Sequence, residues 1–181
     1  MRMMDWLDGH IHLLTLLWLF PILFMFHDFE EILTVEKWIG EKGEGIYKRL
    51  PAFARKVYGG SFQMNTFQFA KDVLWVFIII VTVTAITVFF DFYLLFLAVL
   101  HVFFAHVFTH VGQSILLRMY TPGVITSIFI VLPYSIYAYY RLFAEQVIDT
   151  QDLYISIVLM LILLPFALFM LLKGRRRNTA S

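Results

Sequence analysis

Cysteine is absent from the 181-residue chain, and charged residues make up only 15% of it. The lack of cysteine excludes disulfides, thiolate nucleophiles and cysteine metal ligands, so any metal site must be built from nitrogen and oxygen donors. The formal net charge is only +1, which gives no reason to invoke a nucleic-acid ligand. We therefore expect no nucleic acid among the partners of this chain.

Apolar residues dominate what remains. The hydrophobic fraction is 61%, aromatic residues make up 18%, and the mean hydropathy is +0.80. A water-soluble domain of this size has too little interior to bury so much apolar surface, whereas lipid-facing helices need no interior. The composition thus predicts one integral membrane domain over residues 1–181, with membrane lipids as its surroundings.

Five apolar runs approach the roughly 20 residues that a helix needs to cross a bilayer. They lie near residues 9–36, 62–90, 92–118, 123–141 and 152–172, and residues 37–61 form a charged loop after the first run. Only a tight turn around Asp91 separates the second and third runs, which predicts antiparallel neighbours. The expected fold class is all-α, a polytopic membrane helical bundle with about five transmembrane helices.

The basic residues indicate an orientation. Of the 14 Lys and Arg residues, all but Arg2 and Arg141 fall on one side of the predicted spans. By the positive-inside rule, this side is the cytoplasm, so the N-terminus is expected outside and the C-terminus and loop 37–61 inside. The expected location is the cell (plasma) membrane, as a multi-pass protein. The cytoplasmic set is Lys37, Lys42, Lys48, Arg49, Arg55, Lys56, Lys71, Arg118, Lys173, Arg175, Arg176 and Arg177.

The first apolar run leads into the polar sequence FHDFEE. On a helix, His27, Glu30 and Glu31 are spaced i, i+3 and i+4, so their side chains share one face. His27 lies about 10 residues, or roughly 15 Å, inside the interface expected at Trp38. A single charge at the membrane centre costs on the order of 3 kcal/mol. We therefore expect these groups to face the bundle interior and to have partners there.

The third run, in the sequence HVFFAHVFTHVGQS, supplies such partners. His106 and His110 are spaced i and i+4, and they lie about 18 and 12 Å from the end expected at Arg118. His101 points about 140° away from His106 and is expected to be structural. His106 and His110 thus reach the depth of His27. Two histidines hydrogen-bonded between helices would be the simpler explanation.

Imidazole nitrogen and carboxylate oxygen together bind Zn²⁺ or non-haem iron. We expect His27, His106 and His110 to bind such an ion with Glu30 or Glu31, the other glutamate accepting the proton of a bound water. Without a metal, His27 and a glutamate could exchange a proton with a substrate. The catalytic candidates are His27, Glu30 and Glu31. Spacing does not decide whether His106 or His110 lies closer to the glutamates.

Further polar residues could line a pocket that opens toward the cytoplasm. Gln68 and Asp72 share a face at the start of the second run. Gln113 follows the histidines of the third run and could hydrogen-bond to them. A position at the cytoplasmic surface is the alternative for Gln68 and Asp72.

The sequence HDFEE has the form H-x-x-E-E, and YTPG at residues 120–123 has the form Y-x-P-G. With a histidine in a later span, these motifs resemble the HXXEE family of small membrane proteins, over the first to the fourth predicted spans. The resemblance implies a shared architecture but no mechanism, because the family has no assigned reaction. Its pattern falls on His27, Glu30, Glu31, Tyr120, Pro122 and Gly123, with His110 as the match to its further histidine and His106 as the competing match.

These features predict a membrane-embedded enzyme that acts on a lipid or another hydrophobic small molecule through an intramembrane His/Glu cluster. A metal-dependent reaction would be of the hydrolase or oxidoreductase type and would use Zn or Fe. A metal-free reaction would be a proton transfer of the isomerase or cyclase type. The alternatives are a proton- or ion-coupled transporter or binding component, working as a homo-oligomer, and a structural membrane protein.

Overall fold

Helices make up the regular structure of the described chain. The computed structural model describes residues 3–52, Arg55, Gly59, Phe62 and 64–178, without the side chains of residues 3–5, 168 and 170–178. These residues contain no strand, which confirms the predicted all-α class. The helices are α1 (Met3–His10), α2 (Leu13–Trp38), η1 (Ile39–Gly43), α3 (Glu44–Arg49), α5 (Thr66–Phe90), α6 (Tyr93–Leu117), α7 (Val124–Thr126), η3 (Ser127–Val131), α8 (Leu132–Ala144) and α9 (Thr150–Asn178).

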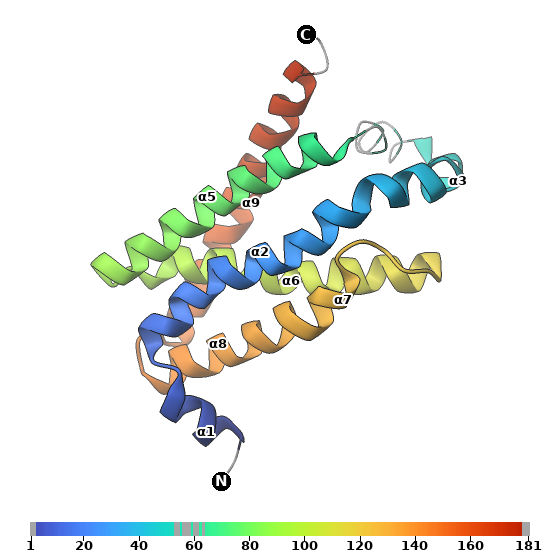
Figure 1. The fold of residues 1–181 in the computed structure, drawn as a ribbon. Coiled ribbons are helices and arrows are strands. Elements are labelled where there is room, and N and C mark those ends of the chain that lie inside the picture. The colour runs from blue at the N-terminus through green and yellow to red at the C-terminus, as the bar shows by residue number, and fades with distance from the viewer. Residues whose placement is uncertain (1–2, 53–54, 56–58, 60–61, 63, 179–181) are drawn as a thin grey trace.

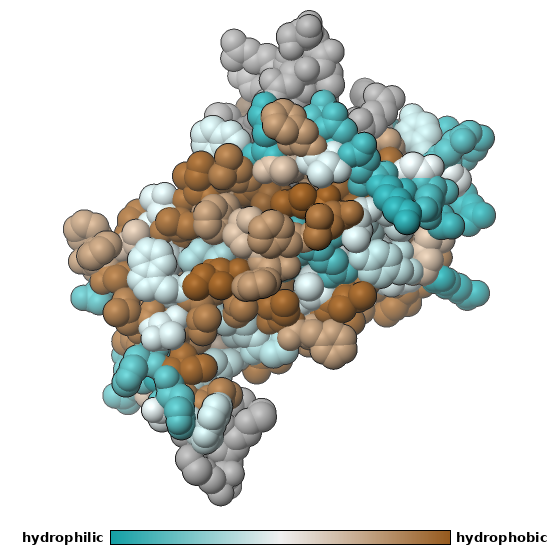
Figure 2. Space-filling view, in the orientation of Figure 1, coloured by the Kyte–Doolittle hydropathy of each residue, from teal (hydrophilic) through white to brown (hydrophobic). Residues whose placement is uncertain are grey.

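Within the described residues, five helical segments are long and apolar enough to cross a membrane, as the sequence predicts. They are Leu13–Arg49, Thr66–Phe90, Tyr93–Leu117, Val124–Ala144 and Thr150–Ala167. Figure 2 shows hydrophobic residues over the middle of one face of the molecule, with hydrophilic residues concentrated toward opposite ends. Length, composition and this distribution indicate a membrane-embedded protein.

The first span is longer than the sequence predicts. Residues 37–49, expected in the loop 37–61, continue the helix of α2 through η1 and α3. The backbone N–H of Ile39 still donates to the carbonyls of Val35 and Glu36, and Lys48 pairs with Glu44 at 2.6 Å one turn apart. The helix ends at Leu50, which is extended because it precedes Pro51. Three glycines in this segment thus do not break the helix.

The second and third spans form the predicted antiparallel hairpin. Asn65 caps the start of α5 by accepting from the backbone N–H of Gln68, whose side chain accepts in turn from the backbone of Asn65. At the other end, Asp91 takes a left-handed conformation with φ 53° and closes the helix. The chain then turns directly into α6.

An aromatic core holds α2 against α6. The ring of Phe20 lies 5.3 Å from Phe96, 5.1 Å from Phe103 and 6.0 Å from Tyr134, and all four residues are buried. Burying four such rings is a large part of the packing that fixes the relative positions of these helices. In Figure 1, α2 runs across the bundle with α6 behind it, α5 on one side and α8 on the other. This packing therefore brings His27, two turns after Phe20, close to His106, one turn after Phe103.

The fourth span is interrupted near its start. Gly123, with φ 83°, precedes the single turn α7, and the π-helical segment η3 separates α7 from α8. The turn at Pro122 and Gly123 joins the third span to the fourth. Short π-helical insertions are rare and often lie at functional sites.

Candidate metal centre

Four side chains from two spans converge inside the bundle. His27 and Glu31 come from α2, one helical turn apart, and His106 and His110 come from α6 with the same spacing. The Oε1 atom of Glu31 lies 2.8 Å from His110 Nε2, 3.7 Å from His106 Nε2 and 3.7 Å from His27 Nε2. The Nε2 atoms of His106 and His110 are 2.7 Å apart. One atom from each residue can be chosen so that all four lie within 4.8 Å of one another.

This spacing is close to that of a first coordination shell. Ligands bound tetrahedrally to zinc at 2.0–2.1 Å lie roughly 3.3 Å from one another. Four of the distances between these atoms run from 2.7 to 3.7 Å and bracket that value, and the whole set lies within 4.8 Å. Among the described residues, His27 Nε2 is buried without a hydrogen-bond partner, and Glu31 Oε1 is a carboxylate oxygen surrounded by three imidazole nitrogens. A cation at the centre of the four atoms would satisfy both.

The cluster is closed on most sides and open on one. The exposed fraction of the side chain is 1% for His27, 8% for His110 and 12% for Glu31. His106 differs, with 43% of its side chain exposed. The site can therefore be reached at His106, which lies within a helix long and apolar enough to cross a membrane.

Glu30 does not join the cluster, although the sequence predicts it as a metal ligand. Its carboxylate faces the start of α7 and accepts hydrogen bonds from the backbone N–H of Thr126 at 2.8 Å and of Ile125 at 3.4 Å. It also accepts from the hydroxyls of Thr126 at 2.6 Å and Tyr120 at 2.7 Å. A carboxylate at this position satisfies the free N–H groups of a helix N-terminus.

Thr126 was not among the predicted site residues, yet it contacts both halves of the H-x-x-E-E motif. Its Oγ1 atom lies 2.9 Å from His27 Nδ1, while its hydroxyl donates to Glu30. The signal available in the sequence was a Thr-Ser pair within an otherwise apolar fourth run, three residues after Gly123. Polar residues of this kind usually bond to a neighbouring helix.

Gly123 lies directly against the cluster. A Cβ atom at this position would be 2.5 Å from Glu31 Oε1 and 2.6 Å from His110 Cε1. The residue is also in the left-handed region, where a side chain costs energy. Both the backbone conformation and the space beside Glu31 thus require glycine.

Tyr120 and Pro122 complete the turn before α7. The backbone carbonyl of Tyr120 accepts from the indole N–H of Trp38 at 2.9 Å, which joins the turn to the end of α2. Partial burial and the hydrogen bond to Glu30 raise the pKa of the Tyr120 phenol, so it remains a donor at neutral pH. The turn therefore positions Glu30, while Pro122 precedes the glycine that adjoins Glu31.

The remaining predicted pocket residues lie outside the cluster. Gln68 takes part in the cap of α5, Asp72 lies on the same helix half-buried, and Gln113 is exposed on α6. None of the three contributes an atom to the four-residue set. Asp28, between His27 and Phe29, is 7% exposed and does not belong to the four-residue set.

His101 belongs to a separate polar contact, as the sequence predicts. Its ring lies 2.5 Å from the hydroxyl of Tyr139 and 2.9 Å from that of Ser156. These bonds join α6, α8 and α9 at buried positions. The role of this histidine is to fasten helices.

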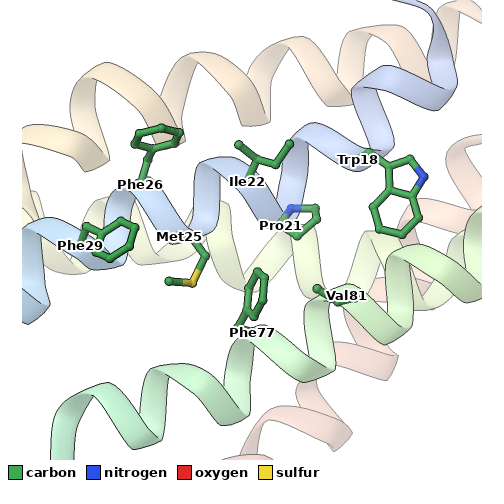
Figure 3. A pocket seen from close by; sticks show the side chains of 8 residues that line it. All are labelled: Trp18, Pro21, Ile22, Met25, Phe26, Phe29, Phe77 and Val81. Carbon is green, nitrogen blue, oxygen red and sulfur yellow. The ribbon is translucent and has the colours of Figure 1, made fainter. Parts of the chain in front are cut away.

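Two grooves run along the surface of α2, and neither includes a cluster residue. The larger, of about 390 Å³, is apolar and lies between α2 and α5 (Figure 3). The second, of about 310 Å³, lies between α2 and the fourth span. The expected polar pocket is not one of these two grooves. The first is lined by Trp18, Pro21, Ile22, Met25, Phe26, Phe29, Phe77 and Val81.

Comparison with known proteins identifies a family and no further relative. No curated protein and no solved structure matches the chain. One family model matches residues 18–138, which include the second and third spans, most of the first and fourth, and all four cluster residues. The chain therefore belongs to the HXXEE family, described as "Protein of unknown function with HXXEE motif".

Proposed function

We propose that this protein is a membrane-embedded, metal-dependent enzyme that acts on a lipid or another hydrophobic small molecule. The observation that carries the proposal is the convergence of four buried or half-buried donor atoms, from His27, Glu31, His106 and His110, within apolar helices. Intramembrane ionisable groups are costly to insert and are usually functional. Under this proposal the histidine and the second glutamate of H-x-x-E-E are both ligands.

The donor set favours Zn²⁺ or Fe²⁺. Imidazole suits both ions, a carboxylate is an accepted fourth donor, and the chain has no thiolate to offer. Bound there, either ion would polarise a carbonyl or phosphoryl oxygen, and iron would add redox chemistry. These two cases correspond to hydrolase and oxidoreductase reactions.

The exposure of the ligands supports a substrate that itself resides in the membrane. His27 and His110 are covered, so only the His106 side of the cluster is open. A molecule reaching His106 within a span passes through the hydrocarbon region or along the helix surface. An amphipathic lipid satisfies this condition better than a freely soluble metabolite.

Glu30 is a poor candidate for the proton acceptor that the sequence suggests. Both of its oxygens already accept hydrogen bonds from the fourth span and from Tyr120. In the proposed function Glu30 therefore holds the surrounding structure, and we assign no proton step to it.

A second candidate function is metal-free proton transfer. The 2.8 Å distance between Glu31 Oε1 and His110 Nε2 favours it, because a carboxylate and an imidazole at this separation can share a proton. An isomerase or cyclase would use such a pair, and so would a proton-coupled transporter.

Elemental analysis of the purified protein in detergent separates these functions. The variants are Glu31→Ala and His110→Ala, and the control is His12→Ala, an exposed histidine whose side chain makes no capping bond. About one zinc or iron per chain in the wild type and the control, lost in both site variants, would support the metalloenzyme. No metal in any protein, with pH-dependent solute uptake into vesicles, would support transport. Site variants that change stability alone would indicate a structural role.

A further inference from the structure

The fourth span contributes no metal ligand, but it contacts His27 through one hydroxyl group. We propose that Thr126 is a positioning residue of the metal centre: it links Glu30 to His27 and holds the imidazole with Nε2 free to bind the ion. The inference rests on the proposed function, and it gives a role to the first glutamate of the motif, which is not a ligand.

The direction of the hydrogen bonds follows from counting protons at Thr126. Its hydroxyl carries one proton, and the nearest acceptor is Glu30 Oε2 at 2.6 Å. The carbonyl of Gly123 is the other candidate acceptor, at 3.4 Å, where a hydrogen bond is much weaker. The hydroxyl proton therefore goes to Glu30, and the oxygen of Thr126 is left to accept.

Glu30 is an acceptor toward every group around it. The backbone N–H groups of Ile125 and Thr126 and the hydroxyl of Tyr120 all donate to its two oxygens. A carboxylate surrounded by donors has no proton to give to Thr126. The direction from Thr126 to Glu30 is therefore set by the whole environment of Glu30.

His27 must then donate its Nδ1 proton to Thr126, 2.9 Å away. A neutral imidazole carries a single N–H, so the proton at Nδ1 leaves a lone pair on Nε2. That atom is buried and lies 3.7 Å from Glu31 Oε1, on the side of His106 and His110. The linkage thus selects the tautomer that a metal requires.

The other two histidines lack such a link among the described residues. His110 Nδ1 is buried without a hydrogen-bond partner, and His106 Nδ1 has only Thr109 Oγ1 at 3.4 Å. Metal-binding histidines usually donate their second N–H to a carboxylate, a carbonyl or water, and loss of that partner typically weakens metal binding about 10–100-fold. His27 is therefore the fixed member of the set, and Thr126 provides what fixes it.

Three variants test the role of the hydroxyl. Thr126→Val keeps the shape and removes the hydroxyl, Thr126→Ser keeps the hydroxyl, and Thr84→Val is the control at a fully buried threonine of α5. Zn²⁺ affinity is measured in detergent by competition with a chelator, and Co²⁺ bound in place of zinc gives a visible spectrum that reports the ligand geometry. We expect about 10–100-fold weaker binding and an altered spectrum for Thr126→Val, with Thr126→Ser and Thr84→Val close to wild type.

Wild-type affinity and spectrum in Thr126→Val would overturn the inference. Equal losses in Thr126→Val and Thr126→Ser would do so as well, since keeping the hydroxyl in Thr126→Ser would then preserve nothing. If the wild type binds no metal, the proposed function fails. The hydrogen bond from His27 to Thr126 is then tested on the metal-free protein. ¹⁵N NMR of labelled histidine should then find His27 protonated at Nδ1 in the wild type and in Thr126→Ser; protonation at Nε2 would refute the link.

Discussion

Glu30 and Glu31 are adjacent in the sequence, but their carboxylates serve different structures. Glu31 lies among three imidazoles at distances of 2.8 to 3.7 Å, whereas Glu30 accepts hydrogen bonds from the first turn of the fourth span. The difference arises because successive residues on a helix point about 100° apart. A helix placed between two neighbours can thus present one acid to each.

Neutralising the two acids should therefore have unequal effects. Glu31→Gln removes a ligand charge at the centre of the cluster, and we expect it to abolish stoichiometric metal binding. Glu30→Gln keeps an oxygen that can accept from Thr126, so we expect metal binding weakened about 10-fold. Chelator competition on both purified variants measures this. Equal losses in the two would contradict the separate roles.

Gly123→Ala should damage both the fold and the site. The left-handed conformation costs roughly 1–2 kcal/mol with a side chain, and the added methyl group would collide with Glu31 and His110. The matched control is Gly112→Ala, because a Cβ atom at that position on α6 meets nothing within 4 Å. Thermal unfolding in detergent should find Gly123→Ala destabilised and depleted of metal, and Gly112→Ala at least as stable as wild type. Similar behaviour of the two variants would argue against close packing at Gly123.

Tyr120→Phe should weaken the support of Glu30 without removing a ligand. A hydrogen bond to a charged group contributes about 1.5–3 kcal/mol when sheltered, and less here because Tyr120 is 40% exposed. We expect a loss of stability below about 1.5 kcal/mol, with metal still bound.

The contribution of Tyr120 should also depend on pH. Because the folded-state pKa of this phenol is raised, its stabilisation is present below the ordinary tyrosine value of about 10 and is lost as the pH rises through the higher value. The stability difference between wild type and Tyr120→Phe should thus shrink above about pH 10. A difference that stays constant from pH 7 to 12 would contradict this reading.

His101→Ala tests whether the second polar contact is separate from the metal centre. The substitution leaves the hydroxyls of Tyr139 and Ser156 without their shared partner, which should cost about 1–3 kcal/mol of stability. Metal content should stay at the wild-type level. Loss of metal from a protein that remains folded would show that the two polar sites are coupled.

The spans and the histidine pair of α6 could be predicted because they depend on local periodicity. Apolar run lengths located the five described helices that are long and apolar enough to cross a membrane, and i, i+4 spacing placed His106 and His110 on one face of α6. The depth of His27, counted from the basic residues, brought it level with them. The sequence does not decide whether His106 or His110 lies closer to Glu31. In the structure both imidazoles approach its carboxylate, and His110 is the closer.

Other features depended on contacts that periodicity does not contain. The role of Glu30 follows from the position of α7, which a turn with φ 83° at Gly123 determines. Thr126 becomes relevant only once that turn is placed beside His27. The helix between Trp38 and Arg49 was missed because three glycines suggested a loop, whereas continued backbone hydrogen bonding outweighs their modest cost.

The π-helical segment η3 has a consequence for how the fourth span faces its neighbours. Such a segment accommodates about one extra residue, which rotates the helix on its two sides relative to each other by roughly 100°. In an uninterrupted α-helix, the angle about the helix axis between the side chains of Thr126 and Tyr134 would be fixed by the rotation of about 100° per residue. The offset lets one end of the span direct the Thr126 hydroxyl at His27 while the other end buries the ring of Tyr134. If the same residues formed a regular α-helix between Ser127 and Val131, one of these two side chains would be rotated away from its partner.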